Sequence, residues 1–460
     1  MTGRYACNHL SGCGVDNLLL VSVPAAGILL LLFLVIRLRL AAFVALLLVS
    51  VLVGLGTNMP GGEILDSIRN GMGGTLGFVA VVVGLGAILG QLLESCGGID
   101  CIARTVIGRF GADRAQWGLG VTGFIVAIPV FFDVALIILL PLVYGLALKS
   151  GRSLLYYAAP LLAGLAVTHS FVPPTPGPIA VAELLGADLG WVIIFGTLAG
   201  IPSMILAGPL FGRYLARRIH VDVPESFAEA VNTQAGGNIS FARVAAIILL
   251  PLVLIMGSSV APLWPGTGHT VTSVLTFVGH PFVALLAATL LAMVFLGRMD
   301  GFTKDDILAI ANKGLEPAGI VILITGAGGA FKQLLIDSGV GNALADMVAD
   351  SQMPLILLAF MIAALTRIAQ GSATVAMITA AGLMAPITAT QELSAMMLAL
   401  LVIATSSGAT ILSHVNDSGF WLVSRYLGIS ERDTLRSWTV LTTIISLTGL
   451  SVAALLSLLV

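Results

Sequence analysis

Charged residues are scarce in this sequence: Asp, Glu, Lys and Arg make up only 10% of its 460 residues. Water-soluble proteins carry roughly 25% charged residues because their surfaces must be hydrated. Hydrophobic residues reach 58% and the mean hydropathy is +1.07, an excess too large to bury in one globular core. The composition therefore excludes a water-soluble protein and predicts a polytopic membrane protein whose apolar surface faces lipid.

The sequence also lacks a strong net charge and a recognisable metal motif. Its formal charge is −2, which argues against nucleic acid as a partner. Cys7, Cys13, Cys96 and Cys101 do not fit a zinc pattern, and no histidine pair lies beside them. Neither a metal nor another cofactor is predicted. Cys7 and Cys13 could pair if the N-terminus is outside; disorder or a mis-assigned start is an equal alternative.

Long apolar runs are abundant, and ten of them approach the ~20 residues that cross a bilayer as a helix. These runs lie near residues 17–36, 40–57, 73–94, 153–171, 190–212, 241–260, 280–297, 315–337, 391–412 and 437–458. Residues 1–16 lack the basic flank of a signal peptide, so the first run is expected to remain as a helix.

Two further apolar runs, 116–148 and 354–386, each contain 33 residues. A single helix of that length would be about 50 Å long, which is too long for one crossing and too short for two crossings with a turn. A re-entrant hairpin fits this length, with two arms that dip into the membrane and a tip that is buried in protein or lines a cavity.

The two halves of the chain resemble each other. Gln91 in GLGAILGQLLES corresponds to Gln333 in GAGGAFKQLLIDS, 242 residues later, and Gly71 corresponds to Gly314. His169 likewise corresponds to His414. The near-constant offset predicts a duplication. The expected parts are an N-terminal extension (1–16), a first repeat (17–215), a cytoplasmic linker (216–239) and a second repeat (240–460).

Each repeat is expected to contain five crossings and one hairpin, and this odd number inverts one repeat relative to the other. Lys and Arg collect on the cytoplasmic side of membrane proteins. With both termini outside, seventeen of the 21 basic residues fall on the cytoplasmic side, whereas the opposite orientation reverses this count. The sequence thus predicts an all-α, multi-pass protein of a bacterial inner (plasma) membrane, built from two inverted repeats.

Four interruptions in the apolar runs mark a candidate binding site, because transporters with inverted repeats bind substrate where helices are broken. The hairpin tips are Ile128–Ala135 and Arg367–Ala376, and two other spans break at Thr168–Pro178 and Ile411–Trp421. Proline cannot continue a helix, and Asn, Asp, Ser and Gly favour turns. The half-helices that restart after each break present N-termini, which attract anions.

Charged side chains at membrane depth are costly and usually functional. Asp133 is a candidate proton carrier, with a structural role at the hairpin as the alternative. Asp417 is the second candidate for proton coupling. Arg367 could grip a substrate carboxylate, or it could snorkel or pair with Asp133 or Asp417. The role of Lys332 is left open.

Polar residues at the breaks supply the remaining candidates. Histidines at matching breaks suggest a ligand or proton role, although a buried histidine is often structural, and the hydroxyl and amide groups suit a polyol. The predicted substrate-binding residues are Thr168, His169, Thr175, Gly177, Arg367, Gln370, Gly371, Ser372, Thr374, Ser413, His414, Asn416 and Ser418.

Five segments together make the chain similar to the gluconate permease (GntP) family of the ion transporter superfamily. They are GMGGTLGFVAVVVGLG (Gly71–Gly86), PVFFDVALIILLPL (Pro129–Leu142), HSFVPPTPGP (His169–Pro178), QGSATVA (Gln370–Ala376) and SHVNDSGFW (Ser413–Trp421). The resemblance implies uptake of gluconate or a related sugar acid together with protons. Some relatives carry D-serine instead.

Two positions depart from the family pattern. Asp133 stands where the family commonly has Glu, which keeps the acid but shortens its reach. Thr175 stands where the family commonly has His, between Pro174 and Pro176, which weakens a direct transfer of substrate contacts. Another small carboxylate is therefore the alternative to gluconate.

Two other classes of function are less consistent with the sequence. An intramembrane hydrolase could use Ser413 and His414, but neighbours in sequence seldom face each other, and no G-x-S-x-G or H-E-x-x-H motif is present. A passive channel would not need inverted repeats with broken helices. The sequence predicts a secondary transporter of a small organic anion and protons, and it leaves open whether the protein forms a homo-oligomer.

Overall fold

A computed structural model describes residues 37–111, 114–224, 239–261, 269–299, 301–338 and 353–460, with isolated residues between 23 and 34. The N-terminal extension with Cys7 and Cys13, and most of the predicted linker, lie outside the described residues. The helices of the first half are α2 (Ala42–Gly56), α3 (Gly61–Ser95), α4 (Gly98–Phe110), α5 (Ala115–Val126), α6 (Phe132–Ser150), α7 (Leu154–Phe171), α8 (Pro176–Leu185), α9 (Leu189–Ile205), the π-helical turn η2 (Leu206–Leu210) and α10 (Phe211–Arg218). Those of the second half are α12 (Phe241–Val260), α13 (His269–Val278), α14 (Pro281–Met299), α15 (Lys304–Asp337), α17 (Leu355–Gln370), α18 (Ala373–Ala389), α19 (Ala395–Thr410), α20 (Ser418–Leu427), α21 (Glu431–Thr434), the π-helical turn η5 (Leu435–Thr439) and α22 (Val440–Ser457).

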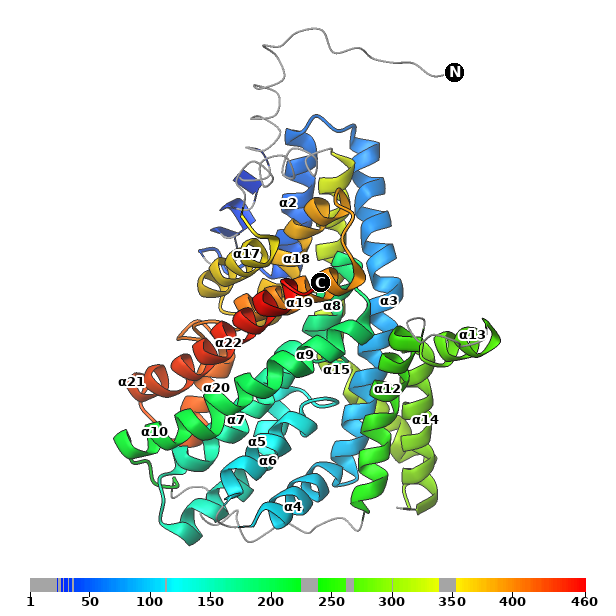
Figure 1. Cartoon of the computed structure of the whole chain (residues 1–460). Coiled ribbons are helices and arrows are strands. Elements are labelled where there is room, and N and C mark those ends of the chain that lie inside the picture. Colours follow the sequence, from blue (N-terminus) through cyan, green and yellow to red (C-terminus); the bar gives the residue numbers. More distant parts are fainter. Residues whose placement is uncertain are drawn as a thin grey trace.

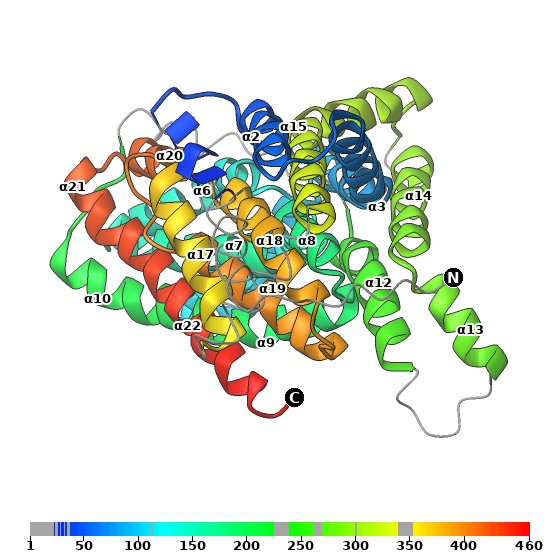
Figure 2. The ribbon, with the colours of Figure 1, turned by 90° about the horizontal axis from the view of Figure 1, so that it is seen from above.

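Membrane-spanning helices dominate the described part of the chain, which confirms the predicted all-α polytopic class. Seven helices there are long and apolar enough to cross a membrane, and α13 with α14, which meet at 59°, form an eighth candidate. Figures 1 and 2 show α12, α13 and α14 at one edge of the molecule and α10 and α21 at the opposite edge.

Helices α3 and α15 are longer than the apolar runs 73–94 and 315–337 that predicted them. They contain 35 and 34 residues, so each is about 50 Å long. The apolar pattern does not include their charged first turns, although these turns are helical. Helix α3 begins directly after Pro60, and α15 begins after the capping box at Thr303. The amphipathic α4, with Asp100 and Arg109, was missed for the same reason.

The two long helices cross in close, reciprocal contact. A Cβ atom built on Gly71 of α3 would lie 2.4 Å from the Gly329 carbonyl oxygen and 2.5 Å from the Gln333 Cβ of α15. One built on Gly314 of α15 would lie 2.9 Å from the carbonyl oxygen of Ala87 and 3.0 Å from the Gln91 Cβ of α3. The helices are therefore antiparallel.

Equivalent residues make these two sets of contacts, because Gly71 matches Gly314 and Gln91 matches Gln333 in the sequence alignment of the halves. Such reciprocity is the signature of a two-fold axis. It supports the proposed division into inverted repeats at 17–215 and 240–460, which stays a proposal. Figure 1 shows α3 running over most of the height of the molecule with α15 behind it.

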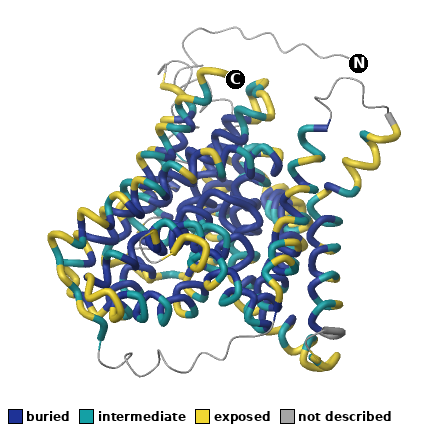
Figure 3. The backbone as a smooth tube through the Cα atoms, turned by 60° about the horizontal axis from the view of Figure 1, so that its bottom comes forward, coloured by how far each residue is buried: buried dark blue, intermediate teal, exposed yellow. Residues whose placement is uncertain are grey.

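The helix breaks lie where the sequence predicts them. Each 33-residue apolar run forms two helices, and the chain between them leaves the helical conformation at 127–131 and at 371–372. The other two breaks lie at 172–175, between α7 and α8, and at 411–417, between α19 and α20. The break at 172–175 is deep in the protein, because all four of its residues are buried, and Figure 3 shows the buried segments gathered in the middle of the molecule. The loop at 411–417 is only partly buried.

The crossing of α3 and α15 can be tested with matched glycine substitutions. Gly71→Ala forces a methyl group against the Gly329 carbonyl oxygen, and such overpacking typically costs about 1–3 kcal/mol. We expect a lower midpoint of thermal unfolding for the purified protein in detergent. Gly73→Ala on the same helix is the control, because its Cβ would meet nothing within 4 Å. Equal midpoints for the two variants would contradict the close crossing.

Candidate functional site

A cavity of about 390 Å³ lies where three of the breaks meet, a volume within the range of small-molecule sites. Its walls come from helix ends in both halves of the chain. The lining residues are Phe132, Asp133, Ala166, His169, Ser170, Arg367, Gln370, Gly371, Ser372, Ala373, Thr374, Thr410, Asn416, Asp417, Ser418, Gly419, Trp438 and Thr442.

The N-termini of three helices form part of this cavity. Helix α6 begins at Phe132, α18 begins at Ala373 after the N-cap Ser372, and α20 begins at Ser418 after the N-cap Asp417. Unpaired N–H groups and the helix dipole make each N-terminus locally positive. Three such ends around one cavity create a region that favours an anion.

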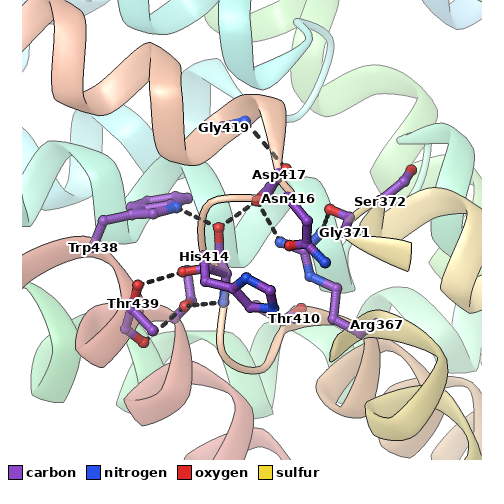
Figure 4. Close-up of polar contacts among 12 residues, drawn as sticks. Arg367, Gly371, Ser372, Thr410, His414, Asn416, Asp417, Gly419, Trp438 and Thr439 are labelled. Atoms are coloured by element: carbon purple, nitrogen blue, oxygen red, sulfur yellow. Dashed lines mark hydrogen bonds and ion pairs between the residues drawn. The ribbon is translucent and has the colours of Figure 1, made fainter. Parts of the chain in front are cut away.

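A buried ion pair joins the two breaks of the second half. Arg367 Nη2 donates to Asp417 Oδ2 at 2.5 Å, and the exposed fractions of the two side chains are only 5% and 11%. Arg367 Nη1 donates to the carbonyl oxygen of Gly371, while Asp417 Oδ1 accepts from the Gly419 amide at 3.1 Å. Figure 4 shows Arg367 reaching from the end of α17 to the loop before α20. The charges of both residues are thus largely balanced within the protein.

A hydroxyl network fixes the same loop from its other side. The Ser413 hydroxyl donates to Asp417 and accepts from Trp438 Nε1 at 2.6 Å, and Thr439 donates to the Ser413 carbonyl oxygen (Figure 4). Asn416 Nδ2 donates to the Ile368 carbonyl oxygen at 2.9 Å, and His414 Nε2 lies 3.1 Å from that same oxygen. The loop before α20 and the end of α17 are therefore one hydrogen-bonded unit.

Two buried polar groups at the cavity have no hydrogen-bond partner among the residues that the structure describes. They are the side-chain amide of Gln370, at both Nε2 and Oε1, and the Nδ1 atom of His169. A buried polar atom without a partner is costly, so native proteins usually satisfy it with water or a ligand. These groups are the best placed to bind a polar ligand.

Asp133 is the acidic group of the cavity with the greatest exposure. It lies in the first turn of α6 and is exposed, and it interacts with Asp417 as a like charge. Asp417 accepts hydrogen bonds from Arg367, Ser413 and Gly419. Of the two acids, Asp417 is therefore held by hydrogen bonds, whereas the Asp133 carboxylate has no hydrogen bond or ion pair with the described residues.

Ten of the fifteen predicted site residues line the cavity, and five do not. Thr168 donates to the Phe124 carbonyl oxygen at 2.9 Å, Gly177 packs against the Met377 sulfur, and Ser413 and His414 lie in the network behind the cavity wall. Thr175 donates to the Val172 carbonyl oxygen at 2.7 Å and lines a much smaller chamber between α3 and the first hairpin tip. The ten that line the cavity are Asp133, His169, Arg367, Gln370, Gly371, Ser372, Thr374, Asn416, Asp417 and Ser418.

Four polar lining residues were not predicted: Ser170, Thr410, Trp438 and Thr442. Ser170 directly follows the predicted His169, and Thr410 lies three residues before the predicted Ser413, at the ends of α7 and α19. Trp438 and Thr442 belong to η5 and α22, in an apolar run without a break in its residue pattern. Trp438 lies in the π-helical turn and donates to the Ser413 hydroxyl, and the apolar pattern of this run does not indicate that contact.

The geometry also argues against the alternative considered above, an intramembrane hydrolase that uses Ser413 and His414. The Ser413 hydroxyl faces Asp417 and Trp438, while His414 Nε2 faces a backbone carbonyl, so they do not form a nucleophile and base. A cavity among broken helices in a bundle of membrane spans instead defines a transporter.

Comparison with known proteins agrees with this class. The chain belongs to the GntP family of permeases, whose family model matches residues 18–459. It is 41% identical over 435 residues to the low-affinity gluconate transporter of Escherichia coli K12, covering 95% of this chain and 97% of that protein. It is 40% identical over 428 residues to the Gnt-II system L-idonate transporter of the same organism, covering 93% and 97%.

A solved structure with the same fold is the YdaH transporter of Alcanivorax borkumensis. The TM-score is 0.61 at 17% sequence identity, with 86% of this chain and 88% of that chain covered. The family and the transporters named in it, together with the membrane-spanning helices, make the protein a multi-span membrane transporter.

The buried ion pair yields a test of its structural role. Asp417→Asn leaves Arg367 buried without a counter-charge, which typically costs about 3–5 kcal/mol, so the midpoint of thermal unfolding in detergent should fall strongly. The double variant Arg367→Met/Asp417→Leu removes both charges and should recover most of that stability, because no charge then remains unpaired.

The control is the surface pair Arg69–Asp66, whose side chains are 76% and 62% exposed. Its loss should cost no more than about 1 kcal/mol. If Asp417→Asn is as stable as Asp66→Asn, the ion pair does not hold the two breaks together.

Proposed function

We propose that this transporter carries gluconate or a closely related sugar acid into the cell, together with protons, across a bacterial inner membrane. The observation that carries the proposal is the cavity itself, which combines three helix N-termini, a buried arginine and an unpartnered amide. Two relatives support this substrate class, because one is named as a transporter of gluconate and the other as a transporter of L-idonate, which are both polyhydroxy acids.

The carboxylate of the substrate is expected to bind near the N-termini of α18 and α20. Arg367 uses one Nη2 and one Nη1 hydrogen for Asp417 and Gly371, and a guanidinium has five N–H donors. The others remain for a substrate carboxylate. The unpartnered amide of Gln370 and the hydroxyl of Thr374 then serve the substrate hydroxyls.

Thr175 is less important for recognising the substrate than the sequence suggests. The hydroxyl of Thr175 is bonded to the Val172 carbonyl oxygen, and the residue lines the small chamber rather than the main cavity. The departure from the family pattern at this position therefore does not argue against a sugar acid.

Proton coupling is assigned to Asp133. With Arg367, Asp417 and Asp133 all ionised, the cavity holds one positive and two negative side chains. An anionic substrate is repelled by the second carboxylate, and protonation of Asp133 removes that repulsion. The protein then binds the substrate more tightly when it holds the proton, and the proton more tightly when it holds the substrate. Symport requires this mutual dependence.

Asp417 is an unsuitable proton carrier for a structural reason. Protonating it would take the counter-charge from buried Arg367 and weaken the hydrogen bond from the Gly419 amide. We therefore assign Asp417 to holding the loop, with the loaded cavity changing access as one repeat moves against the other.

Uptake by purified protein in liposomes tests this proposal. An inward proton gradient should drive accumulation of radiolabelled gluconate, and unlabelled L-idonate should compete. Asp133→Asn should abolish accumulation but keep gluconate exchange in the absence of a gradient, because the neutral amide resembles the protonated acid.

Glu392→Gln, which neutralises an exposed acid distant in sequence from the breaks, is the matched control and should accumulate gluconate normally. Uptake that ignores the imposed gradient would refute proton coupling. Normal accumulation by Asp133→Asn would remove this residue from the coupling step, and transport of D-serine instead of gluconate would refute the substrate class.

A further inference from the structure

A second, basic cavity lies away from the broken helices. It has a volume of about 520 Å³ and is formed by the start of α7, the loop before it, α10 and the loop that follows. Three arginines and a histidine contribute to its walls, and Asp222 pairs with that histidine at 3.3 Å. The lining residues are Gly151, Arg152, Ser153, Tyr156, Arg213, Ala216, Arg217 and His220.

Two of the arginines, Arg213 and Arg152, contact neighbouring side chains. Arg213 Nε donates to Gln116 Oε1 at 2.8 Å, and the amide of this buried glutamine in turn donates to the Tyr156 carbonyl oxygen at 2.7 Å. The Arg152 guanidinium lies 4.7 Å from the centre of the Tyr156 ring. Positioned guanidinium groups match phosphate oxygens, because they donate several hydrogen bonds in one plane.

The first turn of α7 also faces this cavity. The amide of Leu154 donates to the Val221 carbonyl oxygen at 2.8 Å, and the buried Ser153 hydroxyl bonds with Ile219 and Val221. The loop after α10 is thereby fixed beside the N-terminus of α7, whose dipole adds to the positive potential of the arginines.

An apolar stripe lies on the outside of the molecule, on the same helical segment, η2 and α10, that carries Arg213 and Arg217 of the basic cavity. Leu206, Leu210 and Tyr214 follow at intervals of four residues and are 43%, 45% and 55% exposed. Residues spaced in this way share one face of a helix. Figures 1 and 2 both show α10 at the periphery of the molecule, where lipid can reach it.

We propose that the basic cavity binds the phosphodiester headgroup of an anionic phospholipid whose acyl chain lies along the stripe Leu206, Leu210 and Tyr214. Basic pockets between membrane helices bind such headgroups. The apolar stripe beside the pocket can contact an acyl chain, which a soluble phosphate does not have. The site is separate from the transport cavity, and the proposal does not depend on which substrate is carried.

Native mass spectrometry of the delipidated full-length protein tests this assignment, with phosphatidylglycerol as the probe and phosphatidylcholine as the neutral comparison. We expect phosphatidylglycerol to bind preferentially. Arg152→Gln/Arg217→Gln should weaken its binding by roughly thirtyfold, since each basic residue beside an anionic lipid contributes a factor of about five. Arg152→Lys/Arg217→Lys keeps both charges but loses the planar donors, so its affinity should lie between those of the wild type and of the Gln variant.

Lys313→Gln/Arg432→Gln is the matched control, because it removes two exposed positive charges outside the cavity and should bind phosphatidylglycerol normally. Gel filtration and thermal unfolding in detergent verify that each variant is folded. Wild-type affinity in Arg152→Gln/Arg217→Gln would overturn the proposal. Equally tight binding of soluble glycerol 3-phosphate would also overturn it, because the occupant would then be a free phosphate and not a lipid.

Discussion

The ion pair between Arg367 and Asp417 is the interaction on which the candidate site depends. Two opposite charges buried in a membrane protein are tolerated only when they neutralise each other and their hydrogen bonds are satisfied. Here the pair does both, and it also joins the end of α17 to the loop before α20. The pair lies next to Gln370, Asn416 and the N-termini of α18 and α20, so it helps to hold these parts of the cavity wall together.

The contact between residues 367–371 and 413–417, called the junction below, also restricts the backbone at Gly371. Gly371 has a φ of 85°, and a Cβ built on it would lie 2.2 Å from the Asn416 carbonyl oxygen. Only glycine accepts that conformation and that close approach without strain. The junction therefore needs a charge pair, a glycine and an amide at fixed positions, all within two short segments.

The sequence predicted the breaks well and the lining of the cavity less completely. The proline cluster after α7 and the residues Asn416 and Asp417 after α19 disfavour a continued helix, so the breaks that follow α7 and α19 were predictable to within a few residues. Trp438 was not predictable, because its place depends on how the π-helical turn in Leu435–Thr439 packs against a loop 25 residues earlier. Ser413 and Thr168 were misjudged in the other direction, since polarity at a break does not show whether a hydroxyl faces a cavity or a carbonyl.

The long helices show a similar limit. Hydropathy identified the apolar centre of α3 and α15 but not their charged first turns, because it measures burial in lipid and not helix propensity. From the sequence, Gly71 and Gly314 were recognised only as corresponding residues of the two repeats. Their physical role, a crossing in which each glycine admits the partner helix, required coordinates.

The linked junction has a consequence for exchanging parts between related transporters. Residues 367–371 and 413–417 lie more than forty positions apart, yet they share an ion pair, hydrogen bonds to one carbonyl oxygen and a glycine contact. A chimaera whose boundary falls between them would combine halves that were shaped for different partners. Transferring both segments together preserves their contacts. The part that must be exchanged is therefore a pair of segments distant in sequence and not one contiguous stretch of chain.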